Sequence, residues 1–116
     1  MTGETGDLLR LDLPRAEEVR ASLPERDEVD AMAAAAKALG DPTRLAVALA
    51  LREGGQLCGL DLGWVVGVSQ QLVSHHVRLL RTAGLARSER DGKLVLYELT
   101  PDGRTLVDTV RDRRAA

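Results

Sequence analysis

The chain has 116 residues, a formal net charge of −2, a single Cys, one Trp, one Tyr and no Phe. This length suits one small domain, and because aromatic residues are almost absent its core must consist of Leu, Val and Ala, which favours packed helices with at most a small sheet. The single cysteine excludes an intramolecular disulfide framework and suits a cytoplasmic protein, and no apolar run or signal-peptide pattern predicts a membrane partner.

The charge is unevenly distributed along the chain. Residues 1–40 contain nine acidic and five basic residues, whereas residues 64–98 contain three acidic and five basic residues and both histidines. The whole chain is therefore not a basic nucleic-acid binder, but positive charge is concentrated in residues 64–98.

The first half of the chain predicts two helices after an ambiguous start. Within residues 1–26 the sequence "RAEEVRASL" is compatible with a helical turn or two. Residues 27–40 have acids in the first turn, an alanine-rich body and Gly40 at the expected C-cap. The next helix has Asp41 as its N-cap and a proline at its first position, and it ends at residues 54–55.

The second half predicts a short helix, a tight turn, a longer helix, a hairpin and a last helix. The short apolar helix is closed by Gly67, and Ser69 is a good N-cap for the helix at residues 70–83. Two short strands then flank the Asp91-Gly92 pair, which is a strong hairpin signal. Thr100 caps the last helix.

Two helices joined by a tight glycine-bearing turn and followed by a β-hairpin define a winged helix-turn-helix. We therefore predict a mainly α fold with a small β-hairpin. Residues 1–26 are expected to form an N-terminal arm, residues 27–100 the winged helix-turn-helix domain, and residues 101–116 a C-terminal dimerisation helix.

The helix at residues 70–83 has two different faces. Val73, Val77 and Leu80 form an apolar stripe. A second, roughly opposite stripe contains only amide, hydroxyl, imidazole and guanidinium groups, from Gln71, Ser74, His75, Arg78 and Thr82. Such side chains hydrogen-bond base edges and phosphates.

A polar stripe on a helix is more often an ordinary solvated face. Here the absence of acids, the tight turn before the helix and the basic hairpin after it, with Arg87, Arg90 and Lys93 at its tip, favour DNA binding. A protein-interaction module on the same fold remains an alternative, and it would predict acids on the stripe. The predicted DNA contacts are Ser69, Gln70, Gln71, Ser74, His75, Arg78, Arg90 and Lys93.

The adjacent residues His75 and His76 cannot both bind one metal from a helix, because they point about 100° apart. His75 lies on the polar stripe and is predicted to contact DNA. His76 lies beside the apolar stripe and is predicted to be partly buried and hydrogen-bonded. We find no nucleophile–base pair, phosphate-binding glycine loop or metal triad, so the sequence does not predict an enzyme.

Three segments, "ALGDPTRLAVALAL", "QLCGLDLGWVVGVSQQLVSHHVRLLRTAGL" and "RDGKLVLYELT", make the chain resemble the ArsR/SmtB family of bacterial metal-responsive repressors. The similarity extends over about residues 28–100 and is strongest to the cadmium/lead/zinc-sensing branch. It implies a homodimer built from N- and C-terminal helices, bound to an inverted-repeat operator on double-stranded DNA and released by an inducer. Leu39, Leu106 and Val110 are the expected interface residues.

The resemblance also implies a metal site for zinc, cadmium or lead, and here this chain departs from the branch. Only Cys58 and Asp61 remain as candidate ligands, and two ligands are half of a tetrahedral site. Leucines stand where the branch has other cysteines, at Leu9, Leu13 and Leu60. The family's second site uses Asp and His on the last helix, but residues 101–116 contain only Asp102, Asp108 and Asp112.

Three interpretations of Cys58 stay open. It is a ligand of a weak metal site, a thiol redox sensor that acts across the dimer, or a small buried residue at a helix start. No cationic residue lies next to Cys58 in the sequence to lower its pKa, which speaks against the redox sensor. The leucines suggest an apolar contact of the arm in place of a metal bridge.

Overall fold

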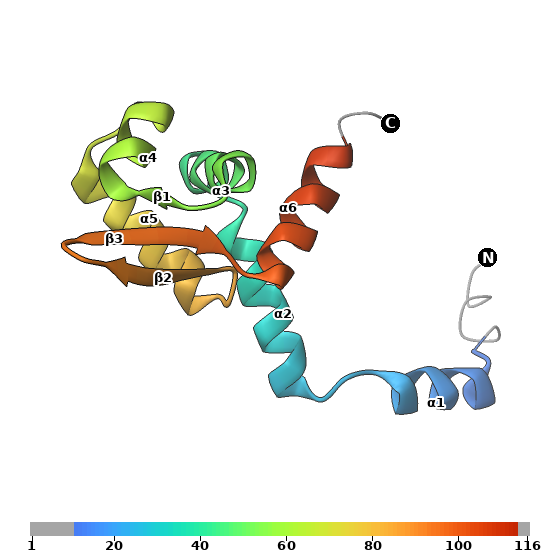
Figure 1. The fold of residues 1–116 in the computed structure, drawn as a ribbon. Helices are drawn as coiled ribbons and strands as arrows, with labels where there is room; N and C mark the ends of the chain where they lie inside the picture. The colour runs from blue at the N-terminus through green and yellow to red at the C-terminus, as the bar shows by residue number, and fades with distance from the viewer. Residues whose placement is uncertain (1–10, 114–116) are drawn as a thin grey trace.

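The computed structural model describes residues 11–113 and contains six helices and three short strands in that range (Figure 1). In chain order the elements are α1 (Leu13–Ser22), α2 (Arg26–Ala38), α3 (Pro42–Gly54), β1 (Leu57–Cys58), α4 (Gly59–Val66), α5 (Gln70–Thr82), β2 (Ala86–Asp91), β3 (Leu94–Leu99) and α6 (Pro101–Asp112). This order confirms the predicted winged helix-turn-helix, with α4 and α5 as its two helices and the β2–β3 hairpin, called the wing below, after them.

The three predicted N-caps are confirmed, as is Gly67 at the end of α4. The side chains of Asp41, Ser69 and Thr100 accept hydrogen bonds from backbone N–H groups in the first turns of α3, α5 and α6. Gly67 ends α4 in the left-handed region, with φ of 81°, which lets the chain enter α5 three residues later, at Gln70. These signals are local, so the sequence alone reveals them.

The end of α2 differs from the prediction. The C-cap is Leu39 at φ of −88°, and Gly40 does not adopt a positive φ. The physical reason lies one helix further on, because the Arg44 side chain donates a 2.6 Å hydrogen bond from Nε to the carbonyl of Ala38. The Arg44 guanidinium therefore provides a donor for a backbone carbonyl at the end of α2, and no left-handed glycine is required there.

The arm contains one clear helix. Asp12 caps α1, and none of the ten residues of α1 is buried. Figure 1 shows α1 standing away from the rest of the chain, at the end remote from α4. The helix α1 thus makes no core contact within this chain.

The sheet contains one strand that the sequence does not predict. The strand order is β1-β3-β2, with Leu57 opposite Tyr97 and Cys58 opposite Leu96 on β1 and β3. A two-residue strand is too short to show an alternating pattern. It nevertheless fixes the start of α4 to the wing, so Cys58 is attached directly to the sheet.

The core lies between the helices and the base of the wing. Val73, Val77 and Leu80 on α5 are fully buried, as the apolar stripe predicts, and burying side chains of this size stabilises the fold by about 1.5–3 kcal/mol each. Gly103 allows the closest approach, because a Cβ at this position would overlap the carbonyl oxygen of Leu85. The start of α6 can therefore pack directly on the chain that leads into β2.

Within residues 11–113 no helix is both long enough and apolar enough to cross a lipid bilayer.

Candidate nucleic-acid interface

The outer face of α5 is polar and fully accessible. Gln71, Ser74, His75, Arg78 and Thr82 are all exposed, and they lie opposite the buried stripe on the same helix. The short helix α4 packs against α5 and the core holds α5 from behind. The stripe is therefore presented as one continuous surface that is about as long as the helix.

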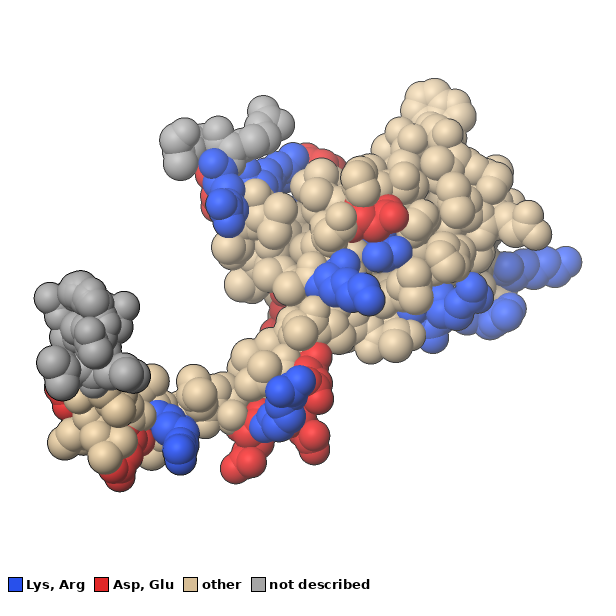
Figure 2. All heavy atoms as spheres, turned by 180° about the vertical axis from the view of Figure 1, so that it is seen from behind, with Lys and Arg blue, Asp and Glu red and all other residues tan. Residues whose placement is uncertain are grey.

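Positive charge gathers on the α5 face, whose polar stripe has no acid, and at the wing tip, where Asp91 lies between Arg90 and Lys93 in the sequence. Figure 2 shows Lys and Arg atoms over α5 and at the end of the wing, with no Asp or Glu atoms among them on the side in view. Arg78, Arg81, Arg90 and Lys93 take part in none of the ion pairs formed among residues 11–113. Their charges remain available to an anionic partner.

The wing is less uniformly basic than the sequence predicts. Arg90 and Lys93 lie at its outer end, but Arg87 lies near its base, where its Nε is 2.8 Å from Glu98 Oε1. The prediction that Arg87 lies at the tip is therefore wrong, because β2 begins at Ala86 and runs outward for four more residues. Glu89 also carries a partner, since Gln56 Nε2 donates a 2.9 Å hydrogen bond to it.

The two histidines have different surroundings, as predicted. His75 is exposed, whereas His76 is only 6% exposed and its Nδ1 lies 3.4 Å from Arg44 Nη1. Burial lowers the pKa of the His76 imidazole, against the opposing pull of the Asp41 carboxylate. Because a guanidinium can only donate, this contact is a hydrogen bond only when Nδ1 is the acceptor, and the lowered pKa favours that neutral form of the ring.

Arg44 joins three helices behind the interface. Its backbone N–H donates to Asp41 Oδ1 at 2.9 Å, which lowers the pKa of the Asp41 carboxyl, while its side chain reaches the end of α2 and His76 on α5. Sequence reasoning missed the contact, since Arg44 and His76 are 32 residues apart.

The candidate metal ligands do not form a site within one chain. Cys58 is half-buried and Asp61 is exposed on α4, and in the described range no three His, Cys, Asp or Glu side chains are grouped to hold an ion. Leu60 and Leu13 are 67% and 55% exposed, and the predicted contact between them is not made within the chain, because α1 lies far from α4 (Figure 1). Leu9 lies outside the described residues.

Tertiary structure gives Cys58 neighbours that the sequence does not show. A cavity of about 330 Å³ between the start of α4, α5 and the wing is lined by Cys58, Gln70, Ser74, Lys93 and Tyr97, among others. A cationic side chain therefore lines the same cavity as the thiol. Two of the predicted DNA contacts on α5 line it as well.

The predicted dimer residues fall into two groups. Leu106 and Val110 are half-buried, and Leu106 lines a groove of about 480 Å³ between α2 and α6 together with Met32 and Ala35. Leu39 is only 7% exposed and belongs to the core of the single chain. Most of its surface is therefore used within its own chain, and its place in a subunit interface stays a prediction.

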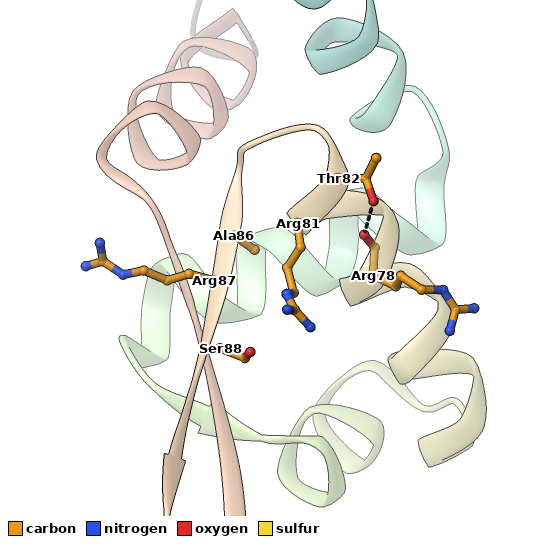
Figure 3. A pocket seen from close by; sticks show the side chains of 6 residues that line it. All are labelled: Arg78, Arg81, Thr82, Ala86, Arg87 and Ser88. Carbon is orange, nitrogen blue, oxygen red and sulfur yellow. Dashed lines mark hydrogen bonds between the residues drawn. The ribbon is translucent and has the colours of Figure 1, made fainter.

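Arg81 is an exposed arginine of α5 that sequence reasoning did not single out. It follows Arg78 by three positions, which is the spacing of neighbours on one helix surface, and this spacing could have revealed it. In the structure Arg81 lines a groove between α5 and β2 with Arg78, Thr82, Ala86, Arg87 and Ser88 (Figure 3). This groove lies inside the basic face described above.

An accessible, acid-free helix face beside a basic wing defines a winged helix-turn-helix protein that binds DNA. Comparisons with known proteins support this class. Residues 41–88 match the family described as "Bacterial regulatory protein, arsR family". The chain is 32% identical over 99 residues to a cadmium resistance transcriptional regulatory protein CadC homolog of Staphylococcus aureus, a match that covers 85% of this chain and 81% of that protein.

Two further likenesses agree. The chain is 42% identical over 76 residues to the HTH-type transcriptional repressor SmtB of Mycobacterium tuberculosis, covering 66% of this chain and 56% of that protein, so it spans little more than half of that relative. The solution structure of a homodimeric winged helix-turn-helix DNA-binding domain from Mycobacterium bovis superposes with a TM-score of 0.72 at 22% identity, over 81% of this chain and 89% of that one. At that identity the likeness concerns the fold.

The chain belongs to the ArsR family of bacterial regulatory proteins and is a DNA-binding transcriptional regulator.

Proposed function

We propose that this protein is a cytoplasmic repressor that binds an inverted-repeat operator as a two-fold homodimer and is released by an inducer. The observation that carries the proposal is the exposed, acid-free stripe on α5 beside the unpaired cations of the wing. The names of two relatives, a transcriptional repressor and a resistance regulator, support the direction of regulation.

In this proposal α5 enters the major groove and the wing lies on the adjoining backbone. The amides of Gln70 and Gln71 suit adenine edges, and Arg78 suits guanine through two parallel hydrogen bonds. Ser69, Ser74 and His75 position the helix, while Arg90 and Lys93 neutralise phosphates. Residues 27–100 thus carry the DNA-binding function.

The proposed dimer uses the groove between α2 and α6. Val29 and Met32 are 40% and 57% exposed on α2, and Leu106 and Val110 are half-buried on α6. These apolar side chains lie on helices at the outer part of the domain, and a second copy related by a two-fold axis would bury both sets at once. The operator half-sites would then lie about one helical turn, roughly 34 Å, apart.

We further propose that the sulfur-rich metal site of the cadmium/lead/zinc-sensing branch is absent here. A ligand shifts a regulator between two states only by its difference in affinity for them. Cys58 and Asp61 alone offer a soft metal little binding energy in either state. The exposed Leu13 on α1 and Leu60 on α4 instead suit an apolar contact between the arm of one subunit and α4 of its partner.

The test is a titration of a fluorescent operator duplex with the protein, with and without Zn²⁺, Cd²⁺ and Pb²⁺. The duplex is first selected from random-sequence DNA by binding to the protein. We expect tight binding by the wild type and by Cys58→Ser, and little change on adding any of the three metals. If Cd²⁺ releases the DNA and a thiolate-to-Cd²⁺ charge-transfer band appears, the proposal that the metal site is absent is wrong, and the proposed repressor function still stands.

A thiol redox sensor is the second candidate, because Lys93 lines the same cavity as Cys58. In that case a mild oxidant would link two Cys58 thiols across the dimer and release the operator, and Cys58→Ser would abolish the response. A wild-type protein that keeps the operator under oxidation excludes this candidate.

A further inference from the structure

The groove between α5 and the wing is the strongest feature that the proposed function leaves unused. It encloses about 540 Å³ and is lined by Arg78, Arg81, Thr82, Ala86, Arg87 and Ser88, without a carboxylate. It shares Arg78 and Thr82 with the α5 stripe, adds Arg81 and the first residues of β2, and does not include Arg90 or Lys93 of the wing tip. Its lining combines guanidinium and hydroxyl groups, the donors that proteins use to bind phosphate.

The side chains around the groove are not equivalent. Figure 3 shows the Arg81 side chain extending from α5 into the space between the helix and β2, with the Ser88 side chain pointing into the same space from β2. Arg78 extends away from this space along the outer side of α5, and Arg87 points to the opposite side of the wing. Only Arg81 and Ser88 therefore face each other across the groove.

Both side chains have unused hydrogen-bonding capacity. Arg87 is occupied by its ion pair with Glu98, and the hydroxyl of Thr82 donates to the carbonyl of Arg78 at 3.0 Å. By contrast, no hydrogen bond or ion pair among residues 11–113 uses the side chain of Arg81 or Ser88. Ala86 forms a small, buried part of the lining, which lets a ligand approach β2 closely.

The geometry of bound DNA indicates which ligand the groove would hold. If α5 lies in the major groove and the wing lies beside it, the sugar–phosphate strand that borders this major groove must pass between the two elements. The groove runs between the same two elements. We infer that it binds one backbone phosphate, with Arg81 donating through its planar guanidinium and Ser88 through its hydroxyl.

This inference rests on the proposed function and extends it, because it assigns Arg81 and Ser88 to sequence-independent positioning of the operator. A phosphate contact fixes where α5 sits in the major groove but carries no base information. The effect of removing Arg81 should therefore differ from that of removing Arg78, which is proposed to read a base.

The experiment measures binding of the full chain to the selected operator and to an unrelated duplex between 50 and 200 mM KCl. Arg81→Ala should weaken binding to both duplexes by the same factor, about tenfold or more. It should also lower the slope of log K against log salt by about 0.9 for each protomer, because one fewer counterion is released. Arg81→Lys, which keeps the charge and loses the planar fork, should lie between Arg81→Ala and the wild type.

Ser88→Asp provides a second test from the other wall of the groove. A carboxylate placed beside Arg81 should occupy its guanidinium and repel the phosphate, so that binding to both duplexes weakens as it does in Arg81→Ala. Arg20→Ala is the matched control, since Arg20 is an exposed arginine on α1, outside the groove. Circular dichroism and sedimentation of each variant establish that it is folded and assembled like the wild type.

The outcomes separate the two proposals. A wild-type protein that binds neither duplex overturns the proposed function itself. If the wild type binds and Arg81→Ala has the affinity and salt slope of Arg20→Ala, the phosphate site is wrong while the repressor function stands. A change in sequence preference in Arg81→Ala also overturns the phosphate site, because Arg81 would then read a base. If Arg81→Ala does not fold, Arg81→Lys and Ser88→Asp decide by the same criteria.

Discussion

Replacing Arg44 by methionine tests whether one side chain joins α2, α3 and α5. The change removes the 2.6 Å hydrogen bond from Nε to the carbonyl of Ala38 and leaves that partly buried carbonyl without its charged donor. Hydrogen bonds to charged groups contribute about 1.5–3 kcal/mol. The 3.4 Å contact with His76 is at the outer limit for a hydrogen bond and adds little. Methionine retains much of the apolar stem.

We therefore expect Arg44→Met to lower the free energy of unfolding by about 2 kcal/mol. For a chain of 116 residues that corresponds to a fall of roughly 8 °C in Tm. Urea unfolding at one fixed protein concentration is the assay, because association with a second copy would add to the measured stability.

Arg26→Met is the matched control. Its guanidinium also makes a side-chain hydrogen bond, at 2.9 Å to Asp30, but the two side chains are 86% and 60% exposed. An exposed pair at this helical spacing contributes only about 0.3–0.5 kcal/mol. If Arg44→Met and Arg26→Met unfold at the same urea concentration, Arg44 does not join the three helices and the explanation of the α2 end is wrong.

Three further predictions concern pH, packing and DNA. The pKa of His76 is lower in the folded than in the unfolded chain, so the unfolded chain binds the proton first and the free energy of unfolding should fall as the pH drops through about 6.5. In His76→Gln the urea midpoint should depend less on pH between pH 7 and 5.5 than in the wild type. An equal pH dependence in the two proteins contradicts this. Gly103→Ala should destabilise by about 1–3 kcal/mol, because its methyl group would overlap the carbonyl of Leu85. Thermal unfolding measures the loss beside a Gly59→Ala control, whose added Cβ would lie no closer than 3.5 Å to its neighbours. Arg78→Ala should cost about 1–3 kcal/mol in operator binding and change the preferred base sequence, whereas Lys93→Ala should weaken binding to all duplexes alike. If both variants prefer the same base sequence, Arg78 does not read a base.

The local features of this fold could be predicted from the sequence. Asp41, Ser69 and Thr100 begin helices because a side chain that accepts a backbone N–H acts within three residues of itself. The two faces of α5 follow from its period in the same way, and Val77 is buried while Arg78 is exposed. These features, with the glycine at the hairpin turn, were enough to predict the winged helix-turn-helix and the polar stripe on α5.

Contacts between distant parts of the chain were decided by tertiary structure alone. β1 exists because Leu57 and Cys58 meet β3 about 40 residues later, and the same pairing places Cys58 in a cavity with Lys93. Leu39, predicted to contact a second subunit, is buried in its own core. Arg81 and Ser88 face each other only because α5 and β2 pack side by side. The position of a residue in the helix or strand period determines which face of the element its side chain occupies. Which other element that face contacts depends on how the elements pack in three dimensions.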